Sequence, residues 1–117
     1  MHELSVTSSI LHIVLNHAAM NGVKRVLSVN LEIGAMSDLQ QPWMQKYFDR
    51  LSRGSVAQGA SLRITRVPAV LECRDCRQSF EVASLQEEKT LHCQSCTSRN
   101  IRLKSGREYR VLNMEAY

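Results

Sequence analysis

Two stretches decide how this chain folds: CRDC at residues 73–76 and CQSC at residues 93–96. They hold all four cysteines of the chain, and sixteen residues separate the two pairs. In each stretch one tight turn directs both sulfurs toward a common centre, and two such turns complete a tetrahedral zinc site. Thiolates suit zinc, and four protein ligands leave no position for a reacting water. The spacing therefore predicts a structural Zn²⁺ site made by Cys73, Cys76, Cys93 and Cys96.

Three other interpretations of the cysteines are weaker but stay open. A disulfide framework is disfavoured because the N-terminus lacks the features of a secretory signal, and thiols stay reduced in the cytoplasm, the location we expect. A dithiol oxidoreductase needs one cysteine pair on a thioredoxin-like turn, either Cys73/Cys76 or Cys93/Cys96, and does not require the second cysteine pair. An iron–sulfur cluster also takes four cysteines, but two matching C-x2-C turns favour zinc.

The segment around the cysteines, residues 68–106, has few apolar side chains and cannot form a large hydrophobic core. We therefore expect it to need a bound metal ion in order to fold. Phe80 and Ile101 are the apolar side chains expected to cover it. His92 precedes Cys93, and we expect it to be solvated or to lie outside the ligand set. We therefore predict a zinc-ribbon domain over residues 68–106.

The residues before this segment predict an α/β body. Apolar residues recur at spacings of three and four over residues 4–21, which predicts an amphipathic helix. They alternate with polar residues over 23–34, which predicts a half-buried strand. We expect Ser37 to cap a second helix with Pro42 in its first turn, and a second strand to end before Pro68.

We interpret the large side chains of the second helix as core packing. Four of them recur at helical spacing: Trp43, Tyr47, Phe48 and Leu51. Residues 109–116 return to a β-like sequence, which predicts a strand that rejoins the first domain. The predicted domains are thus residues 1–67 together with 107–117, and the insertion at 68–106.

Composition and charge exclude several classes of protein. Hydrophobic residues make up 44% and charged residues 22%, which argues against a disordered chain, and no apolar run approaches the roughly 18–20 residues that a membrane helix needs. Fifteen Lys/Arg against eleven Asp/Glu give a net charge of +4, with the signs interspersed. Aromatic residues are only 5%, whereas nucleic-acid-binding proteins usually have a basic stripe with interleaved aromatics. We expect no membrane and no nucleic-acid partner.

The main alternative is a zinc-ribbon nucleic-acid-binding module. It is motivated by basic residues of the second half: Arg63, Arg66, Arg99, Arg102, Lys104, Arg107 and Arg110. Phosphate contacts by such residues would give binding a steep salt dependence. We find no Ser/His/Asp set, nucleotide-binding P-loop or carboxylate pair, so we expect no enzyme activity.

The N-terminus offers a second type of metal donor. A methionine followed by a bulky residue is generally retained, so the chain is expected to begin Met1-His2-Glu3. The terminal amine, successive backbone nitrogens and the His2 imidazole form fused chelate rings, and deprotonated amides make this nitrogen set planar, which suits Ni²⁺ or Cu²⁺. On the residues alone, His2 is weak evidence for a metal site, and an unstructured start is the better explanation. His12 and His17 lie five residues apart, about 140° around a helix, and cannot share a metal on one face.

These features occur together in one known family. The chain begins Met1-His2-Glu3-Leu4-Ser5, then has LEIGA at residues 31–35, RGS at 53–55, GA at 59–60, the paired C-x2-C turns and LNME at 112–115. These segments, in this order, cover nearly the whole chain, and the combination of C-x2-C pairs with an initial Met-His-Glu is specific. The chain resembles the HypA/HybF family of nickel-insertion accessory proteins of NiFe-hydrogenase maturation.

The resemblance implies an α+β fold with a small mixed three-stranded sheet, two helices on one face and an inserted zinc-ribbon domain. It implies a nickel metallochaperone rather than an enzyme, in which Zn(II) is structural and Ni(II) is transported. Nickel would be bound by the Met1 amine, the His2 imidazole and the backbone nitrogens of His2 and Glu3. The implied partners are an accessory GTPase, the NiFe-hydrogenase large subunit and, in some organisms, urease accessory proteins. Arg77 and Thr97, which follow the two C-x2-C pairs, depart from residues common in the family but leave the sulfurs in place.

Overall fold

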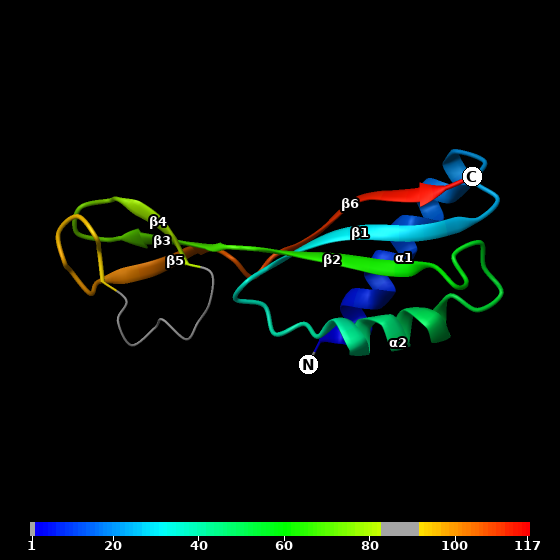
Figure 1. The fold of residues 1–117 in the computed structure, drawn as a ribbon, viewed down its shortest axis with the longest axis horizontal. Coiled ribbons are helices and arrows are strands. Elements are labelled where there is room, and N and C mark those ends of the chain that lie inside the picture. The colour runs from blue at the N-terminus through cyan, green and yellow to red at the C-terminus, as the bar shows by residue number, and fades with distance from the viewer. Residues whose placement is uncertain (1, 83–91) are drawn as a thin grey trace. The chain divides into compact units, whose positions relative to one another are not determined.

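The computed structural model describes residues 2–82 and 92–117, and this part of the chain forms two helices and six strands (Figure 1). In chain order they are α1 (Glu3–Met20), β1 (Val26–Gly34), α2 (Gln41–Leu51), β2 (Ser61–Val67), β3 (Ala69–Cys73), β4 (Ser79–Val82), β5 (Ile101–Ser105) and β6 (Tyr109–Ala116). The strands make two three-stranded sheets, with the orders β2-β1-β6 and β4-β3-β5.

The chain divides into two compact units. The first comprises Met1–Glu32, Asp38–Thr65 and Arg110–Tyr117, and the second comprises Ile33–Ser37 and Arg66–Tyr109. Both helices and most of the β2-β1-β6 sheet therefore belong to the first unit. The second unit holds the β4-β3-β5 sheet and all four cysteines.

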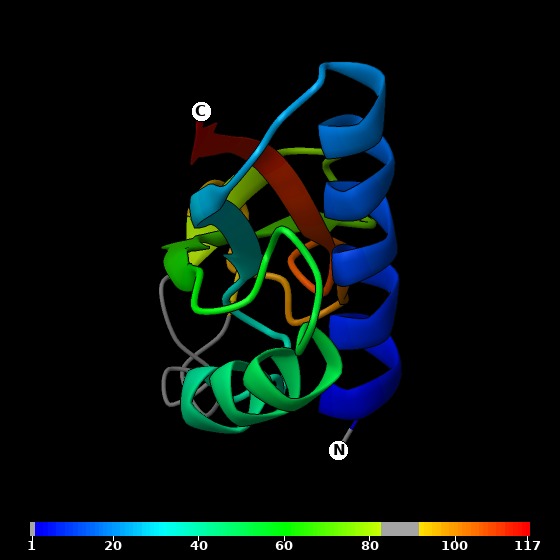
Figure 2. The same cartoon turned by 90° about the vertical axis from the view of Figure 1, so that its right-hand side faces the viewer.

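The sheet of the first unit is mixed, as expected. Strands β1 and β2 run in the same direction, and β6 runs in the opposite direction (Figure 1). Both helices lie on the same face of this sheet (Figure 2). Val29 and Leu31 alternate on β1, and Ile10 and Val14 follow each other at helical spacing on α1; all four are completely buried. The predicted α+β fold class is confirmed.

Helix α1 ends where the sequence predicts. Asn21 is its C-cap and donates its backbone N–H to the carbonyl of His17 at 3.1 Å, and Gly22 follows with φ of +62°. Glycine adopts this left-handed conformation without a Cβ clash, which favours a helix stop. Within the described part of the chain, neither helix combines the length and the apolar character needed to cross a membrane.

The start of α2 differs from the prediction. Ser37 does not cap this helix, which begins at Gln41 with Gln40 as its N-cap and with no side-chain cap hydrogen bond. The backbone N–H of Gln40 donates instead to Oε2 of Glu3 at 3.2 Å. A carboxylate at the start of α1 thus accepts a hydrogen bond from the backbone at the start of α2. In other helices a side chain close in sequence usually accepts such a bond. Pro42 lies in the first turn, as predicted.

The expectation that the large side chains of α2 all belong to the core is wrong for Trp43 and Leu51. Phe48 is completely buried together with Met44, but Trp43 is 52% exposed and Leu51 is 39% exposed. Met44 and Phe48 are four residues apart and share one face, whereas Trp43 lies about 100° around the helix from Met44. The buried face of α2 is therefore the one that contains Met44 and Phe48, one residue along the chain from the series that begins at Trp43.

The sheet of the second unit is antiparallel on both sides of β3. Its small core consists of Ala69, Leu71 and Val82. Phe80 and Ile101 pack against this core, as predicted. Because so few apolar residues are buried here, we expect the cysteine cluster at the end of β3 to contribute to the stability of the unit.

Candidate metal centres

The four cysteines of the second unit converge on one point. Their sulfurs all lie within 4.8 Å of one another, with Sγ of Cys73 3.6 Å from that of Cys96 and Sγ of Cys76 3.3 Å from that of Cys93. Four sulfurs at about 2.3 Å from a tetrahedral zinc ion would be separated by about 3.8 Å. The cluster therefore fits such an ion. Among residues 2–82 and 92–117, no other group of three or more His, Cys, Asp and Glu ligands comes as close.

Both C-x2-C turns have the same backbone structure. In each, the first cysteine donates its N–H to the carbonyl five residues later and accepts the N–H four residues later, at 2.8–2.9 Å. The residue just after each pair, Arg77 or Thr97, has a positive φ, 66° and 61° respectively. Glycine adopts this conformation most easily, so both side chains are accommodated at a cost in backbone strain. The repeated sequence thus produces two equivalent turns.

The backbone of each turn favours a thiolate at the first cysteine. The N–H of Cys96 lowers the pKa of Cys93 to about 6, and the N–H of Cys76 lowers the pKa of Cys73. The pKa of Cys96 is raised to about 12: the N–H of Ser98 favours its thiolate, but burial and the neighbouring sulfurs oppose a further negative charge. A bound divalent cation removes this conflict, because it neutralises the charge that the thiolates concentrate.

Asp75 joins the two turns, a contact that the sequence does not indicate. Its carboxylate accepts a short hydrogen bond from the Ser98 hydroxyl and another from Nδ2 of Asn100 at 3.4 Å. These donors, Ser98 first, lower the pKa of Asp75. The N–H of Arg74 also donates to the carbonyl of Asn100 at 2.8 Å. The two C-x2-C turns are therefore held together by hydrogen bonds in addition to the sulfur cluster.

The structure argues against two of the alternatives raised by the sequence, the dithiol oxidoreductase and the nucleic-acid-binding module. The four sulfurs form one cluster, whereas a dithiol oxidoreductase would present one isolated pair. Of the seven basic residues behind the nucleic-acid alternative, at least three are paired with carboxylates at nitrogen–oxygen distances of 2.7–3.0 Å. The pairs are Arg63–Glu115, Arg102–Glu72 and Arg110–Glu32.

The predicted nickel ligands lie at the start of α1. Met1 lies outside the described residues, His2 is the N-cap, and Glu3 is the first helical residue. His2 is exposed, and its carbonyl accepts the N–H of Val6 at 3.0 Å. Glu3 is only 9% exposed, and its carboxylate accepts from Gln40 as described above. The structure thus exposes His2 and engages the Glu3 side chain with α2.

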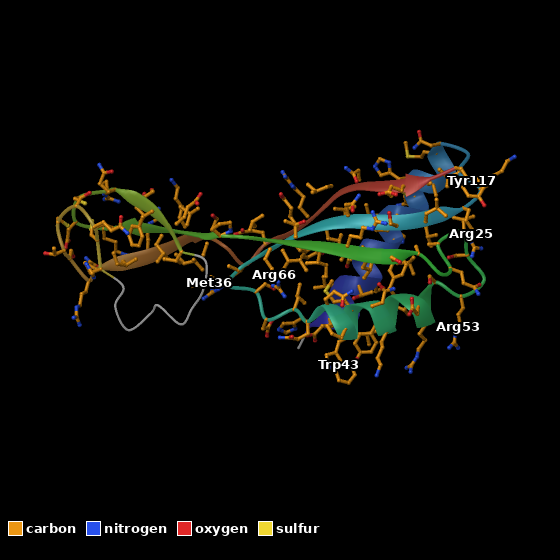
Figure 3. All side chains as sticks on the ribbon, viewed as in Figure 1. Arg25, Met36, Trp43, Arg53, Arg66 and Tyr117 are labelled. Atoms are coloured by element: carbon orange, nitrogen blue, oxygen red, sulfur yellow. The ribbon has the colours of Figure 1, made fainter. Side chains whose placement is uncertain are left out.

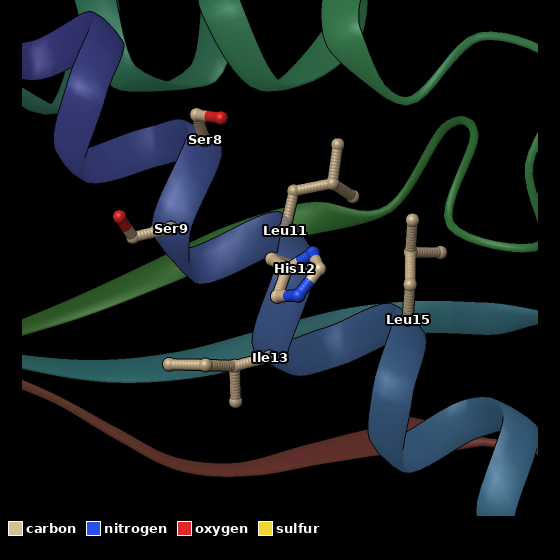
Figure 4. Close-up of a pocket in the computed structure, with 6 residues that line it drawn as sticks. All are labelled: Ser8, Ser9, Leu11, His12, Ile13 and Leu15. Carbon is tan, nitrogen blue, oxygen red and sulfur yellow. The ribbon is translucent and has the colours of Figure 1, made fainter.

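The other histidines of α1 do not join this site. His12 is exposed and lines a shallow pocket on the helix surface (Figure 4) together with Ser8, Ser9, Leu11, Ile13 and Leu15. His17 lines a different pocket, between α1 and β6. Within the described residues neither belongs to a cluster of metal ligands.

The fold and the sulfur cluster define a small α+β protein with a four-cysteine metal site. A model of the family described as "Hydrogenase/urease nickel incorporation, metallochaperone, hypA" matches residues 1–116. The hydrogenase maturation factor HybF of Morganella morganii is 35% identical over 115 residues, and the factor HypA of Syntrophus aciditrophicus is 35% identical over 116; each match covers 98% of both chains. The solution structure of the Ni metallochaperone HypA from Helicobacter pylori is similar at a TM-score of 0.70 and 31% identity, covering 99% of this chain and 97% of that one.

The chain therefore belongs to the HypA family of hydrogenase and urease nickel-incorporation metallochaperones. This confirms the resemblance based on the Met-His-Glu start and the paired C-x2-C turns. A metallochaperone binds a metal ion and passes it on without transforming it. The protein is accordingly a non-enzymatic accessory protein of hydrogenase maturation.

Proposed function

We propose that this protein binds Ni(II) at its N-terminus and delivers it to a hydrogenase precursor, while the four cysteines hold Zn(II). The observation that carries the proposal is the position of His2, exposed at the N-cap of α1 and in a different unit from the sulfur cluster. The proposed nickel ligands are the Met1 amine, the His2 imidazole and the backbone nitrogens of His2 and Glu3.

The start of a helix supplies backbone nitrogens suited to such a chelate. The first four N–H groups of an α-helix have no acceptor within the helix, so metal binding by Glu3 nitrogen breaks no helical hydrogen bond. The same end of the helix carries a partial positive charge and by itself repels a cation. Deprotonated amides compensate for this, because they bring negative charge to the helix N-terminus together with the metal. Binding therefore releases protons and weakens as the pH falls.

Zinc is the ion we assign to Cys73, Cys76, Cys93 and Cys96. Soft thiolates in a closed tetrahedron favour zinc and leave no coordination position for a second ligand. When bound, zinc neutralises the thiolates and holds the two turns together. The nitrogen set at the N-terminus and the sulfur cluster thus select different metals by donor type.

We infer that the nickel acceptor is the NiFe-hydrogenase large subunit and that an accessory GTPase takes part in the transfer. Urease accessory proteins are a second class of acceptor, which the family description supports. We place the protein in the cytoplasm, where thiols stay reduced and a thiolate site persists. Residues 1–67 with 107–117 form the proposed nickel-binding domain, and residues 68–106 form the zinc-ribbon domain.

The transfer of nickel tests this function. Untagged protein is loaded with radiolabelled Ni(II) and incubated with the large-subunit precursor and the GTPase, and the nickel in the precursor is counted. We expect His2→Ala to transfer almost none, while His12→Ala, a matched change on the same helix, transfers as much as the wild type. An N-terminal extension, which removes the terminal amine, should also abolish transfer. Transfer by His2→Ala at the wild-type yield would contradict the proposal.

A further inference from the structure

The outer side of α2 has a surface that neither metal site uses. Its residues follow one another at helical spacing and line a shallow pocket of about 320 Å³. We call this surface the Trp43 face and define it by Trp43, Lys46, Tyr47, Arg50 and Arg53. Figure 3 shows Trp43 and Arg53 projecting from this helix and the turn after it, away from the β2-β1-β6 sheet.

The aromatic part of the Trp43 face is held in a defined position without being buried. The rings of Trp43 and Tyr47 stack with their centroids 6.3 Å apart and their planes at 29°. Nζ of Lys46 lies 5.1 Å from the centroid of the Trp43 ring, within the range of a cation–π interaction. Since Trp43 remains 52% exposed, an ordered indole is presented to solvent.

The helix beneath the Trp43 face is anchored to the core. Met44 and Phe48 on its opposite side are completely buried. Gln45 fixes the flank, because its side chain accepts the N–H of Leu62 at 2.8 Å and donates to the carbonyl of Ala60 at 3.1 Å. A rigid surface loses little conformational entropy when it binds a partner, which favours recognition.

The Trp43 face carries unbalanced positive charge. Lys46, Arg50 and Arg53 oppose a single carboxylate, Asp49, which accepts a hydrogen bond from Gln45 at 2.8 Å. None of the three cations forms an ion pair with any residue that the structure describes. By contrast, the first unit pairs other arginines, such as Arg63, with carboxylates. The charge of the Trp43 face is therefore available to an external partner.

We propose that the Trp43 face docks an acidic segment of a partner protein that inserts an apolar side chain beside Trp43. Trp, Tyr and Arg are the residues that most often dominate protein–protein binding energy. The three cations select for carboxylates, and the stacked aromatic rings select for an apolar anchor. A nucleic acid would instead require an extended basic stripe, and a membrane would require a larger apolar surface. This docking surface is additional to the metal sites, and its occupation does not require nickel.

Trp43 reports directly on the proposed contact because it is the one tryptophan in the chain. Zinc-loaded protein is titrated with a soluble peptide that combines glutamates with leucine anchors, and Trp43 fluorescence is recorded. We expect saturable binding with a shift of emission to shorter wavelength, and weaker binding as salt is added. The same peptide with Gln in place of Glu, or with Ala in place of Leu, should bind at least about tenfold more weakly.

Charge-reversal variants locate the binding surface. The double variant Arg50→Glu/Arg53→Glu should reduce the affinity for the peptide by at least about tenfold. The control Lys24→Glu/Arg25→Glu makes an equal change of net charge in the exposed loop after α1, and its affinity for the peptide should stay within about twofold of the wild type. Circular dichroism verifies that both variants are folded. The proposal is overturned if the acidic peptide fails to bind at low salt, or if both double variants weaken it equally. The proposal is also overturned if the protein, followed by Trp43 fluorescence, binds single-stranded DNA or phosphatidylglycerol vesicles more tightly than it binds the acidic peptide.

Discussion

The backbone N–H of Gln40 donates to Oε2 of Glu3 at 3.2 Å, a hydrogen bond between residues 37 positions apart in the chain. It joins the N-cap of α2 to the first residue of α1. The segment proposed to hold nickel is thereby tied to the second helix. This contact engages the Glu3 carboxylate with the start of α2, whereas the proposed nickel donor of Glu3 is its backbone nitrogen.

This contact predicts a pH-dependent contribution to stability. The N–H groups of Glu3 itself and of Gln40 lower the carboxyl pKa of Glu3 from its ordinary value of 4.5, although burial opposes the shift. A carboxyl group with a lowered folded-state pKa stabilises the fold above its unfolded pKa, and the contribution is lost as the pH falls through the folded pKa. We therefore expect Glu3→Gln to lower the thermal midpoint at about pH 7 and to differ less from the wild type at about pH 3.

Melting curves recorded by circular dichroism at both pH values measure this effect. Glu81→Gln is the matched control, because Glu81 is exposed on β4, and it should leave the midpoint unchanged. Identical midpoints for Glu3→Gln and the wild type at neutral pH would show that the hydrogen bond is not stabilising. A difference that persists undiminished in acid would show that ionisation of Glu3 is not its source.

The strained residues after the C-x2-C turns predict stabilising substitutions. Thr97 is β-branched and has φ of 61°, so Thr97→Gly should raise the free energy of unfolding of the zinc-loaded protein by about 1 kcal/mol. Arg77→Gly should act in the same direction. Gln94→Gly, inside the second turn but without a positive φ, should lower stability, since it only adds entropy to the unfolded chain. Urea titration measures all three, and destabilisation by Thr97→Gly would refute the strain argument.

Gly34 and Gly106 are required by a close backbone approach within the second unit. A Cβ atom at Gly34 would lie 2.0 Å from the carbonyl oxygen of Gly106, and one at Gly106 would lie 2.7 Å from Cβ of Ala69. We expect Gly34→Ala to destabilise the protein by more than about 3 kcal/mol, since backbone has to move on both sides. Gly22→Ala, where the space is open, should cost only about 1 kcal/mol. Similar losses for the two variants in denaturant titrations would contradict the packing described here.

The two aromatic residues of α2 should differ sharply in their contribution to stability. Phe48 is completely buried, so Phe48→Ala should cost about 3–5 kcal/mol of unfolding free energy. Trp43 is half exposed, and Trp43→Ala should cost less than about 1 kcal/mol. Thermal and urea unfolding compare the two variants directly. A loss for Trp43→Ala as large as that for Phe48→Ala would place the indole in the core after all.

The features predicted correctly from the sequence are those that neighbouring residues determine. Each C-x2-C turn is closed by hydrogen bonds within six residues, so its spacing is enough to predict it. The end of α1 within one residue of the predicted residue 21, and the end of β2 before Pro68, are likewise set by the conformational limits of single residues.

The features that the sequence does not indicate depend on distant parts of the chain. Ser37 has the local signature of a cap, but the donor at the start of α2 is satisfied by Glu3 from another helix. Aromatic spacing indicates that α2 is a helix, yet its packing against other elements, α1 among them, decides that Met44 rather than Trp43 is buried. The contact of Asp75 with residues after the second turn also arises only once both turns have come together.

X-ray absorption at the nickel and zinc edges tests most directly whether nitrogen and sulfur donors divide the two metals. The sample is untagged protein with its zinc and one equivalent of Ni(II), alongside His2→Ala. We predict nickel surrounded by nitrogen and oxygen only, with an imidazole signal that His2→Ala loses, and zinc surrounded by four sulfurs at about 2.3 Å in both proteins. Nickel–sulfur scattering in the wild type, or an unchanged nickel spectrum in His2→Ala, would contradict the account.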